Sequence, residues 1–182
     1  MSEETKTRRD VRSFVRTVPE PEELNDEENA QLANLHSLRS EIAARRVGGE
    51  QIPDNATIVK EAGRLERKLG RTFLDAAKRG HAPRLAAYLT QRFRINYADP
   101  KTGETALHIL AAGGARRALR TIMAAQQRLN FLVRDKRGRL SSELAYLYGD
   151  DPVMSRLLAN KERWQAKREG VRLTRRPPPK NA

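Results

Sequence analysis

A short alanine- and glycine-containing pattern recurs along this chain at a nearly constant interval. Its first copy is Ala76-Ala77-Lys78-Arg79-Gly80, and the corresponding glycines Gly80, Gly114 and Gly149 stand about 34–35 residues apart. An apolar residue follows each glycine by five positions: Leu85, Leu119 and Met154. A period in this range is typical of repeat proteins, in which each unit packs on its neighbours only. The period constrains the fold more strongly than any single motif.

The middle copy is the most informative. Residues 99–114 read Asp-Pro-Lys-Thr-Gly-Glu-Thr-Ala-Leu-His-Ile-Leu-Ala-Ala-Gly-Gly. They resemble the turn and first helix of an ankyrin repeat, whose pattern is Gly-x-Thr-Pro-Leu-His-x-Ala-Ala-x-x-Gly. The matching residues are Gly103, Thr105, Leu107, His108, Ala111 and Gly114, with Asn96 and Asn130 where the family places asparagine. The resemblance implies a module that binds other macromolecules and carries out no chemistry.

We therefore expect an all-α fold: a short ankyrin-like helical solenoid of three helix pairs with N-terminal capping helices. The outer copies depart from the family pattern, with Leu69-Gly70-Arg71-Thr72 and Leu140-Ser141-Ser142-Glu143 in place of its turn. Such departures are expected where a repeat has only one neighbour. Each of the three glycines is expected to be left-handed, because the chain must turn sharply between paired helices.

Four segments are expected along the chain. Residues 1–21 are polar and predict a disordered arm, and residues 22–47 predict an amphipathic helix with an acidic start and a basic end. Residues 54–160 predict the ankyrin-repeat domain, which begins with a capping helix over about 55–69. Residues 161–182 predict a basic helix extension followed by a disordered tail.

Composition bounds the class of protein. The 182 residues carry no cysteine, and their net charge is +13. The charge is uneven: residues 1–50 hold 8 basic and 11 acidic residues, whereas residues 51–182 hold 28 and 12, a net charge of +16. No stretch resembles a secretory signal or a membrane span, so we expect a cytoplasmic protein with no membrane partner. The basic region predicts an acidic partner or contact between the two halves.

Nothing in the sequence assembles a catalytic site. His81 and His108 stand where the ankyrin pattern itself places histidine, so a structural role is expected for them. The motifs of phosphate loops, nucleophile elbows and metal-binding histidine pairs are missing from the sequence. We expect no enzyme activity, no cofactor and no metal.

The resemblance also implies a binding surface, because ankyrin stacks meet partners through hairpin tips and the concave side of the first helices. These positions predict a groove with an apolar floor and basic edges: Lys78, Arg79, Lys101, Ile109, Lys136, Arg137, Arg139, Leu144, Leu147 and Tyr148. The partner is expected to be another protein with an acidic or amphipathic surface. Alternatively, the helix over 22–46 fills this groove, with its acidic start facing Lys78 and Arg79.

Two other functions stay open at this stage. The net charge of +16 permits nucleic-acid binding, although the few aromatic residues are not interleaved with the basic ones. Residues 168–182 also resemble the unfolded, arginine-rich export signals of some bacterial type IV secretion effectors. The candidate signal residues are Arg168, Arg172, Arg175 and Arg176.

Overall fold

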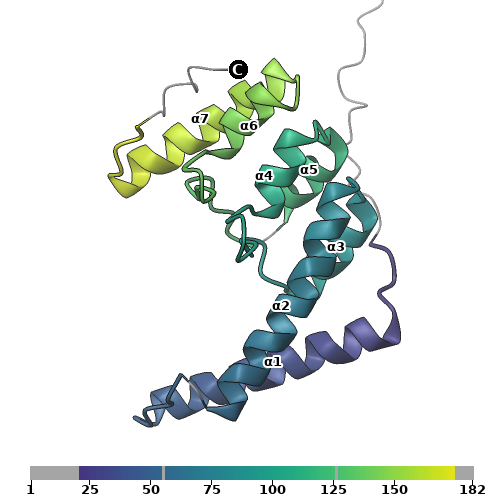
Figure 1. Ribbon diagram of the computed structural model, residues 1–182, viewed down its shortest axis with the longest axis vertical. Helices are drawn as coiled ribbons and strands as arrows, with labels where there is room; N and C mark the ends of the chain where they lie inside the picture. Colours follow the sequence, from purple (N-terminus) through teal and green to yellow (C-terminus); the bar gives the residue numbers. More distant parts are fainter. Residues whose placement is uncertain (1–20, 55, 126, 175–182) are drawn as a thin grey trace, which may run out of the picture.

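The computed structural model describes residues 21–54, 56–125 and 127–174 (Figure 1). These residues form seven helices and no β-strand: α1 (Asp26–Val47), α2 (Thr57–Lys78), α3 (Ala82–Thr90), α4 (Ala106–Ala112), α5 (Arg116–Ala124), α6 (Ser141–Leu147) and α7 (Pro152–Glu169). The expected all-α class is confirmed. Nearly all of the arm expected over 1–21 lies outside the described residues.

The helices form an elongated stack that runs from α1 to α7 (Figure 1). The first half of α2 crosses α1, and its second half pairs with α3. α4 packs between α2 and α6, α5 packs on α3, and α7 packs on α6. From α2 onward, each pair of consecutive helices therefore touches the pair before it.

α2 is one continuous helix of 22 residues. The sequence predicts a break there, between a capping helix over 55–69 and the first repeat helix, and that prediction is wrong. Leu69, Phe73 and Ala77 are all buried and belong to one apolar stripe at helical spacing. The same face of α2 therefore packs across the position of the expected break, and nothing interrupts the helix.

Four aromatic rings form the centre of the core beside α2. The rings of Phe73, Tyr88, Phe93 and Tyr97 lie with centroids 5.3–5.8 Å apart in tilted or edge-on arrangements. Such arrangements are the preferred contacts of aromatic pairs. A Cβ atom on Gly70 would lie only 2.1 Å from the ring of Tyr97. This glycine therefore admits an aromatic ring within a helix and does not end one.

The turns between paired helices use a left-handed residue. Gly80 and Gly114 have φ angles of 63° and 62°, as the sequence predicts. At the third turn the left-handed residue is Asp150, with a φ of 43°, so the prediction for Gly149 is wrong. A Cβ atom on Gly149 would lie 2.4 Å from the carbonyl oxygen of Ala111. Gly149 is therefore needed for the close approach of α4.

A buried polar network fixes α1 against α2 and α3. The carboxylate of Glu28 accepts hydrogen bonds from the guanidinium of Arg84 at 2.6 and 2.8 Å and from the hydroxyl of Tyr88 at 2.7 Å. Burial, together with the nearby carboxylate, raises the pKa of Tyr88, so its hydroxyl stays protonated and donates. On the apolar side, Leu32 and Leu35 are buried. α1 thus closes the N-terminal end of the stack.

Amide side chains join successive helix pairs. Asn96 accepts a hydrogen bond from the backbone N–H of Asn130 at 2.9 Å and donates to the carbonyl oxygen of Arg128 at 2.9 Å. In the next layer Gln165 accepts from the backbone N–H of Phe131 and donates to the side chain of Asn130, both at 2.9 Å. Three of these four bonds satisfy backbone groups that the turns leave without helical partners, and the fourth joins two side chains.

The start of α6 is capped by a side chain from α7. The buried carboxylate of Glu162 accepts two hydrogen bonds from Ser142, from its backbone N–H at 3.0 Å and from its hydroxyl at 2.6 Å. It accepts a third from the hydroxyl of Ser141 at 3.4 Å. Burial raises the pKa of Glu162, and the serine donors oppose that rise. The contact holds the two last helices together.

Candidate functional site

The turn before α4 and the turn before α6 lie against each other at the edge of the stack. The backbone N–H of Lys136 donates to the carbonyl oxygen of Thr102 at 2.8 Å. The ammonium group of Lys136 donates to the carbonyl oxygen of Pro100 at 2.5 Å. Gly103 has a φ of 74°, and a Cβ atom there would lie 2.8 Å from the nitrogen of Lys136. Lys136, predicted at a basic edge, therefore serves mainly to join the two turns.

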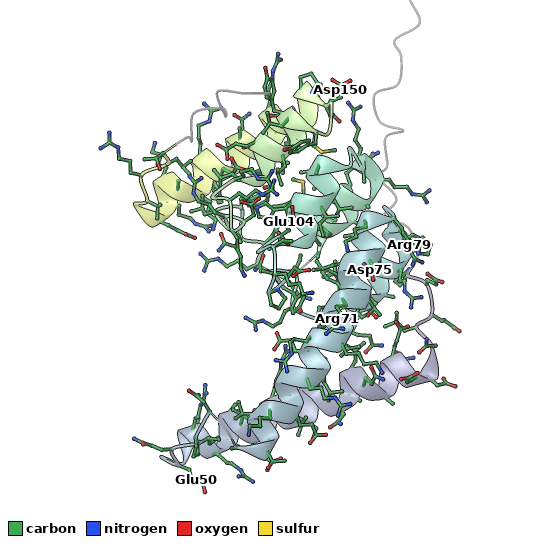
Figure 2. The ribbon with its side chains drawn as sticks, in the orientation of Figure 1. Glu50, Arg71, Asp75, Arg79, Glu104 and Asp150 are labelled. Carbon is green, nitrogen blue, oxygen red and sulfur yellow. The ribbon has the colours of Figure 1, made fainter. Side chains whose placement is uncertain are left out.

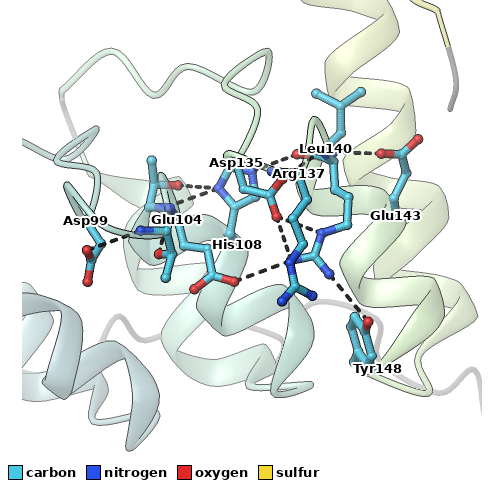
Figure 3. Close-up of polar contacts among 11 residues, drawn as sticks. Asp99, Glu104, His108, Asp135, Arg137, Leu140, Glu143 and Tyr148 are labelled. Carbon is cyan, nitrogen blue, oxygen red and sulfur yellow. Dashed lines mark hydrogen bonds and ion pairs between the residues drawn. The ribbon is translucent and has the colours of Figure 1, made fainter.

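Arg139 lies in the second of these turns, in contact with Asp135, Glu104 and Tyr148, which Figure 3 labels. Its guanidinium contacts Asp135 at 2.6 and 2.7 Å, Glu104 at 3.6 Å and the ring of Tyr148 at 5.8 Å from the centroid. Burial alone would raise the pKa of Asp135, but donors from Arg139 and the backbone N–H of Arg137 lower it. The prediction that Arg139 presents a basic edge to a partner is therefore wrong, because its charge is compensated within the fold. Arg137 is exposed beside it.

His108 joins α4 to the segment that precedes α6 (Figure 3). Its Nδ1 lies 2.8 Å from the hydroxyl oxygen of Thr105 and accepts from the backbone N–H of Thr105 at 3.3 Å. With Nδ1 an acceptor, Nε2 carries the proton and donates to the carbonyl oxygen of Arg139 at 3.3 Å. Burial lowers the pKa of His108. This arrangement matches the structural role expected from the sequence.

An open cleft of about 500 Å³ lies between α2 and the turn before α4. We call it the basic cleft. Tyr97 and Leu74 line it together with six charged residues: Arg67, Arg71, Asp75, Lys78, Asp99 and Lys101. Figure 2 shows Arg71 and Asp75 on α2, with Glu104 farther along the stack. Basic side chains outnumber acidic ones in the cleft by two to one.

Both carboxylates of the basic cleft already have partners. Asp75 pairs with Lys78 at 3.0 Å, and Asp99 accepts a hydrogen bond from the backbone N–H of Lys101 at 2.6 Å. Within the described part of the chain, Arg67, Arg71 and the ammonium of Lys101 form no ion pair. The cleft therefore presents uncompensated positive charge to solvent.

The predicted binding residues do not lie on one continuous surface. Lys78 and Lys101 lie together in the basic cleft, and Arg79 is exposed where α2 ends. The predicted apolar floor is not continuous. Leu144 is only 1 % exposed, so its assignment to the floor is wrong, because α6 turns that side chain toward the core. Ile109 is partly buried against the core as well.

Leu147 and Tyr148 are exposed at the end of α6 and do not line the basic cleft. The structure therefore separates the apolar and basic parts of the predicted groove.

α1 does not fill that groove. Its acidic residues Glu27 and Glu28 pair with Lys68 at 2.8 Å and with Arg84 at 2.6 Å. Lys78 pairs within its own helix, and no residue of α1 lines the basic cleft. The acidic start of the segment lies against the start of α3, where Glu22 is 3.5 Å from His81 and 4.0 Å from Arg84, so the expectation that it faces Lys78 and Arg79 is wrong.

Sequence reasoning missed Arg67, Arg71 and Tyr97. A signal for the arginines was present, since Arg67, Arg71 and Lys78 lie on one face of a continuous helix. The predicted break near Gly70 hid that face. Tyr97 carried no such signal, because its position depends on how the turn after α3 folds back on α2.

The candidate export-signal residues have different surroundings. Arg168 belongs to α7, where its guanidinium lies 4.7 Å from the centroid of the Trp164 ring, so the expectation that it belongs to an unfolded tail is wrong. α7 ends at Gly170, which has a left-handed φ of 67°, and Arg172 follows as an exposed residue. Arg175 and Arg176 lie outside the described residues.

In residues 21–54, 56–125 and 127–174, no three histidine, aspartate or glutamate side chains gather in a way that could hold a metal ion. No helix in these ranges is long and apolar enough to cross a bilayer. No family model, curated protein or solved structure matches the chain.

Proposed function

We propose that this chain is a non-catalytic protein-interaction module whose basic cleft binds an acidic segment of a partner protein. Two observations carry the proposal: four basic and two acidic side chains give one open cleft a net charge of +2, and Arg67, Arg71 and Lys101 form no ion pair within the described residues. Burial raises the pKa of Tyr97 on the same cleft wall, so its hydroxyl is neutral and can donate a hydrogen bond to a carboxylate. Cations around a neutral donor suit a carboxylate-rich ligand.

The fold proposed for this module is a short ankyrin-type solenoid of the pairs α2–α3, α4–α5 and α6–α7. Left-handed residues at equivalent turns, Gly80, Gly114 and Asp150, support it. The hydrogen bonds of Asn96 and Asn130 to successive layers also support it, since both asparagines stand at the ankyrin position. A solenoid presents its turns and first helices along one side, which is where the basic cleft lies.

The affinity should be modest and strongly dependent on salt. Each exposed ion pair contributes about 0.2–1 kcal/mol, so three or four pairs supply only a few kcal/mol. That energy corresponds to a Kd of about 1 mM or weaker for a short acidic peptide. Raising the ionic strength shortens the screening length and weakens binding further.

A charge-reversal comparison tests the proposal. The probe is a fluorescein-labelled peptide of about 12 residues, rich in glutamate with glycine and serine between, titrated with the full chain and followed by fluorescence anisotropy. We expect Arg67→Glu with Arg71→Glu to reduce affinity at least tenfold. The matched control, Arg117→Glu with Arg120→Glu on exposed positions of α5, makes the same change in net charge. If both variants lost the same affinity, the peptide would be binding to the overall positive charge of the protein and not to the basic cleft.

A nucleic-acid probe distinguishes the other use of this charge. A labelled single-stranded oligonucleotide of about 12 nucleotides carries a similar number of charges but also stacks on aromatic rings. The proposal expects weaker binding to it than to the acidic peptide, and no specific effect of the cleft variant. Tight, cleft-dependent binding of the oligonucleotide would replace the proposed function with nucleic-acid binding.

A further inference from the structure

Large exposed apolar side chains are concentrated at the C-terminal end of the stack. In the part of the chain that the structure describes, Val47 is the one example before residue 146, and the others lie between there and residue 171: Tyr146, Leu147, Tyr148, Val153, Leu157, Trp164 and Val171. Clustered exposed apolar residues mark interaction surfaces more often than isolated ones. The outer face of α7 therefore needs an explanation that the basic cleft does not give.

Three of these residues form a stripe along α7. Val153, Leu157 and Trp164 are separated by four and then seven positions, which places them within a narrow arc of one helix face. Leu157 is 43 % exposed and Trp164 is 62 % exposed. The opposite face of α7 is the one that packs on the stack, through Met154 and Leu158. Apart from the guanidinium of Arg168, which lies 4.7 Å from the centroid of the Trp164 ring, the described residues leave the stripe exposed.

The charged residues around the stripe have one sign. α7 carries five basic residues, all exposed: Arg156, Lys161, Arg163, Lys167 and Arg168. Of its two acidic residues, Glu162 is buried against α6, and Glu169 pairs with Arg128 at 2.9 Å and with Arg168 at 3.5 Å. An occupant of the stripe must therefore combine apolar groups with negative charge.

This sign also decides between possible occupants. A second copy docking through the same helix would bring two sets of five cations together, which costs free energy. The chain's own segment 175–182 contains two arginines and a lysine and no acidic residue, so it has the wrong charge. An acidic amphipathic helix has both the required apolar stripe and the required charge.

We propose that the outer face of α7 docks an acidic amphipathic helix of a partner protein. Apolar side chains of that helix cover Val153, Leu157 and Trp164, and its flanking carboxylates face the lysines and arginines on either side. This surface shares no residue with the basic cleft, so the two sites are separate.

Trp164 provides the readout, because it is the one tryptophan of the chain. The probe is a synthetic peptide of about 18 residues with leucines at helical spacing and glutamates on the flanks. Titrating it into the full chain should move the tryptophan emission to shorter wavelength as the indole leaves water. A peptide of identical composition, with the leucine spacing scrambled, should give no such shift. Equal responses to the two peptides would overturn the proposal.

The variant that tests the stripe is Leu157→Glu. It keeps the tryptophan, removes an apolar contact and adds a negative charge that repels the acidic peptide. We expect it to weaken peptide binding at least tenfold. Val47→Glu is the matched control, since Val47 is 90 % exposed at the far end of the molecule and should leave binding unchanged. Arg67→Glu with Arg71→Glu should also leave it unchanged, so failure of this site and failure of the basic cleft are distinguishable.

Two other outcomes would overturn the proposal. An oligonucleotide could quench the emission of Trp164 and bind with higher affinity than the acidic peptide. That result would make the stripe a stacking surface for nucleic acid. Sedimentation equilibrium could instead show a dimer that Leu157→Glu dissociates, which would make a second copy the occupant. Circular dichroism of each variant confirms that the helices are retained.

Discussion

The two ends of the helix stack are finished in different ways. At the N-terminal end α1 lies across α2, buries Leu32 and Leu35, and places Glu28 where Arg84 and Tyr88 satisfy it. At the C-terminal end α7 has a similar supply of apolar residues, yet part of them face solvent. Apolar residues at helical spacing therefore do not by themselves predict burial. What decides is whether another element of the chain lies over them.

The charges follow the same division. The helix that covers the N-terminal end begins with acidic residues, which meet Lys68 and Arg84 in the stack. The uncovered helix carries an excess of cations that no described element neutralises. A stack of helices needs a polar outer face at each end that meets water. Here one end obtains it from a capping helix, and the other from lysine and arginine side chains around an apolar stripe.

The largest expected effect breaks the covered end. Leu35→Ala removes a side chain with no exposed surface, and we expect the free energy of unfolding to fall by about 2–5 kcal/mol. Leu157→Ala is the matched substitution at the uncovered end, where we expect a change of less than about 0.5 kcal/mol. Urea denaturation followed by circular dichroism measures both. Similar losses at the two positions would mean that the stripe on α7 is covered in solution.

A smaller effect concerns the polar half of the same cap. Glu28→Gln removes the charge that Arg84 and Tyr88 face, and we expect it to destabilise the fold by about 2 kcal/mol, less than a fully buried pair because Arg84 is partly exposed. Glu27→Gln alters the neighbouring, exposed pair with Lys68 and should change stability very little. If the two substitutions had equal effects, the network around Glu28 would not be what holds α1.

Sequence reasoning reached the all-α class, because apolar spacing and helix-ending glycines are local properties of the chain. It placed Gly80 and Gly114 in left-handed turns for the same reason. It failed at Gly70 and Gly149, where glycine is required by a neighbour distant in sequence: the ring of Tyr97 and the carbonyl oxygen of Ala111. A glycine that ends a helix and one that admits a neighbour have the same sequence signal.

The site was reached in part. Lys78 and Lys101, which the sequence predicts at a binding surface, both line the proposed basic cleft, because tips and helix ends are exposed in a stack of helix pairs. Arg139 was assigned to the surface although Asp135 and Glu104 hold it, and that pairing depends on how one turn closes. Leu144 was assigned to a groove floor by a helical register that the structure does not follow. The sequence shows which residues are charged or apolar. It does not show which of them form ion pairs or pack in the core of the folded chain.

The smallest expected effect concerns His108, which joins α4 to the segment before α6 and so connects the two ends of the stack. Burial lowers the pKa of His108 below the 6.5 of an unperturbed histidine, although Asp135 and Glu104 nearby favour the charged form. As pH falls below about 6.5, the unfolded chain takes up a proton that the folded chain refuses, so stability present at neutral pH is progressively lost. The loss is at most about 1.4 kcal/mol for each pH unit.

Because His108 bonds the carbonyl oxygen of Arg139, the loss should appear first in α6 and α7, and later in α1 and α2. Hydrogen exchange at pH 7.5 and pH 5.5, corrected for the intrinsic exchange rates, measures protection in each helix. Burial raises the pKa of Glu162, which gives a slope of opposite sign, so His108→Gln is the reference that keeps Glu162 and removes the histidine. We expect the pH dependence of α6 and α7 to be weaker in that variant. An unchanged pH dependence would assign it to carboxylates and remove His108 as the group that ties the uncovered end to the rest of the stack.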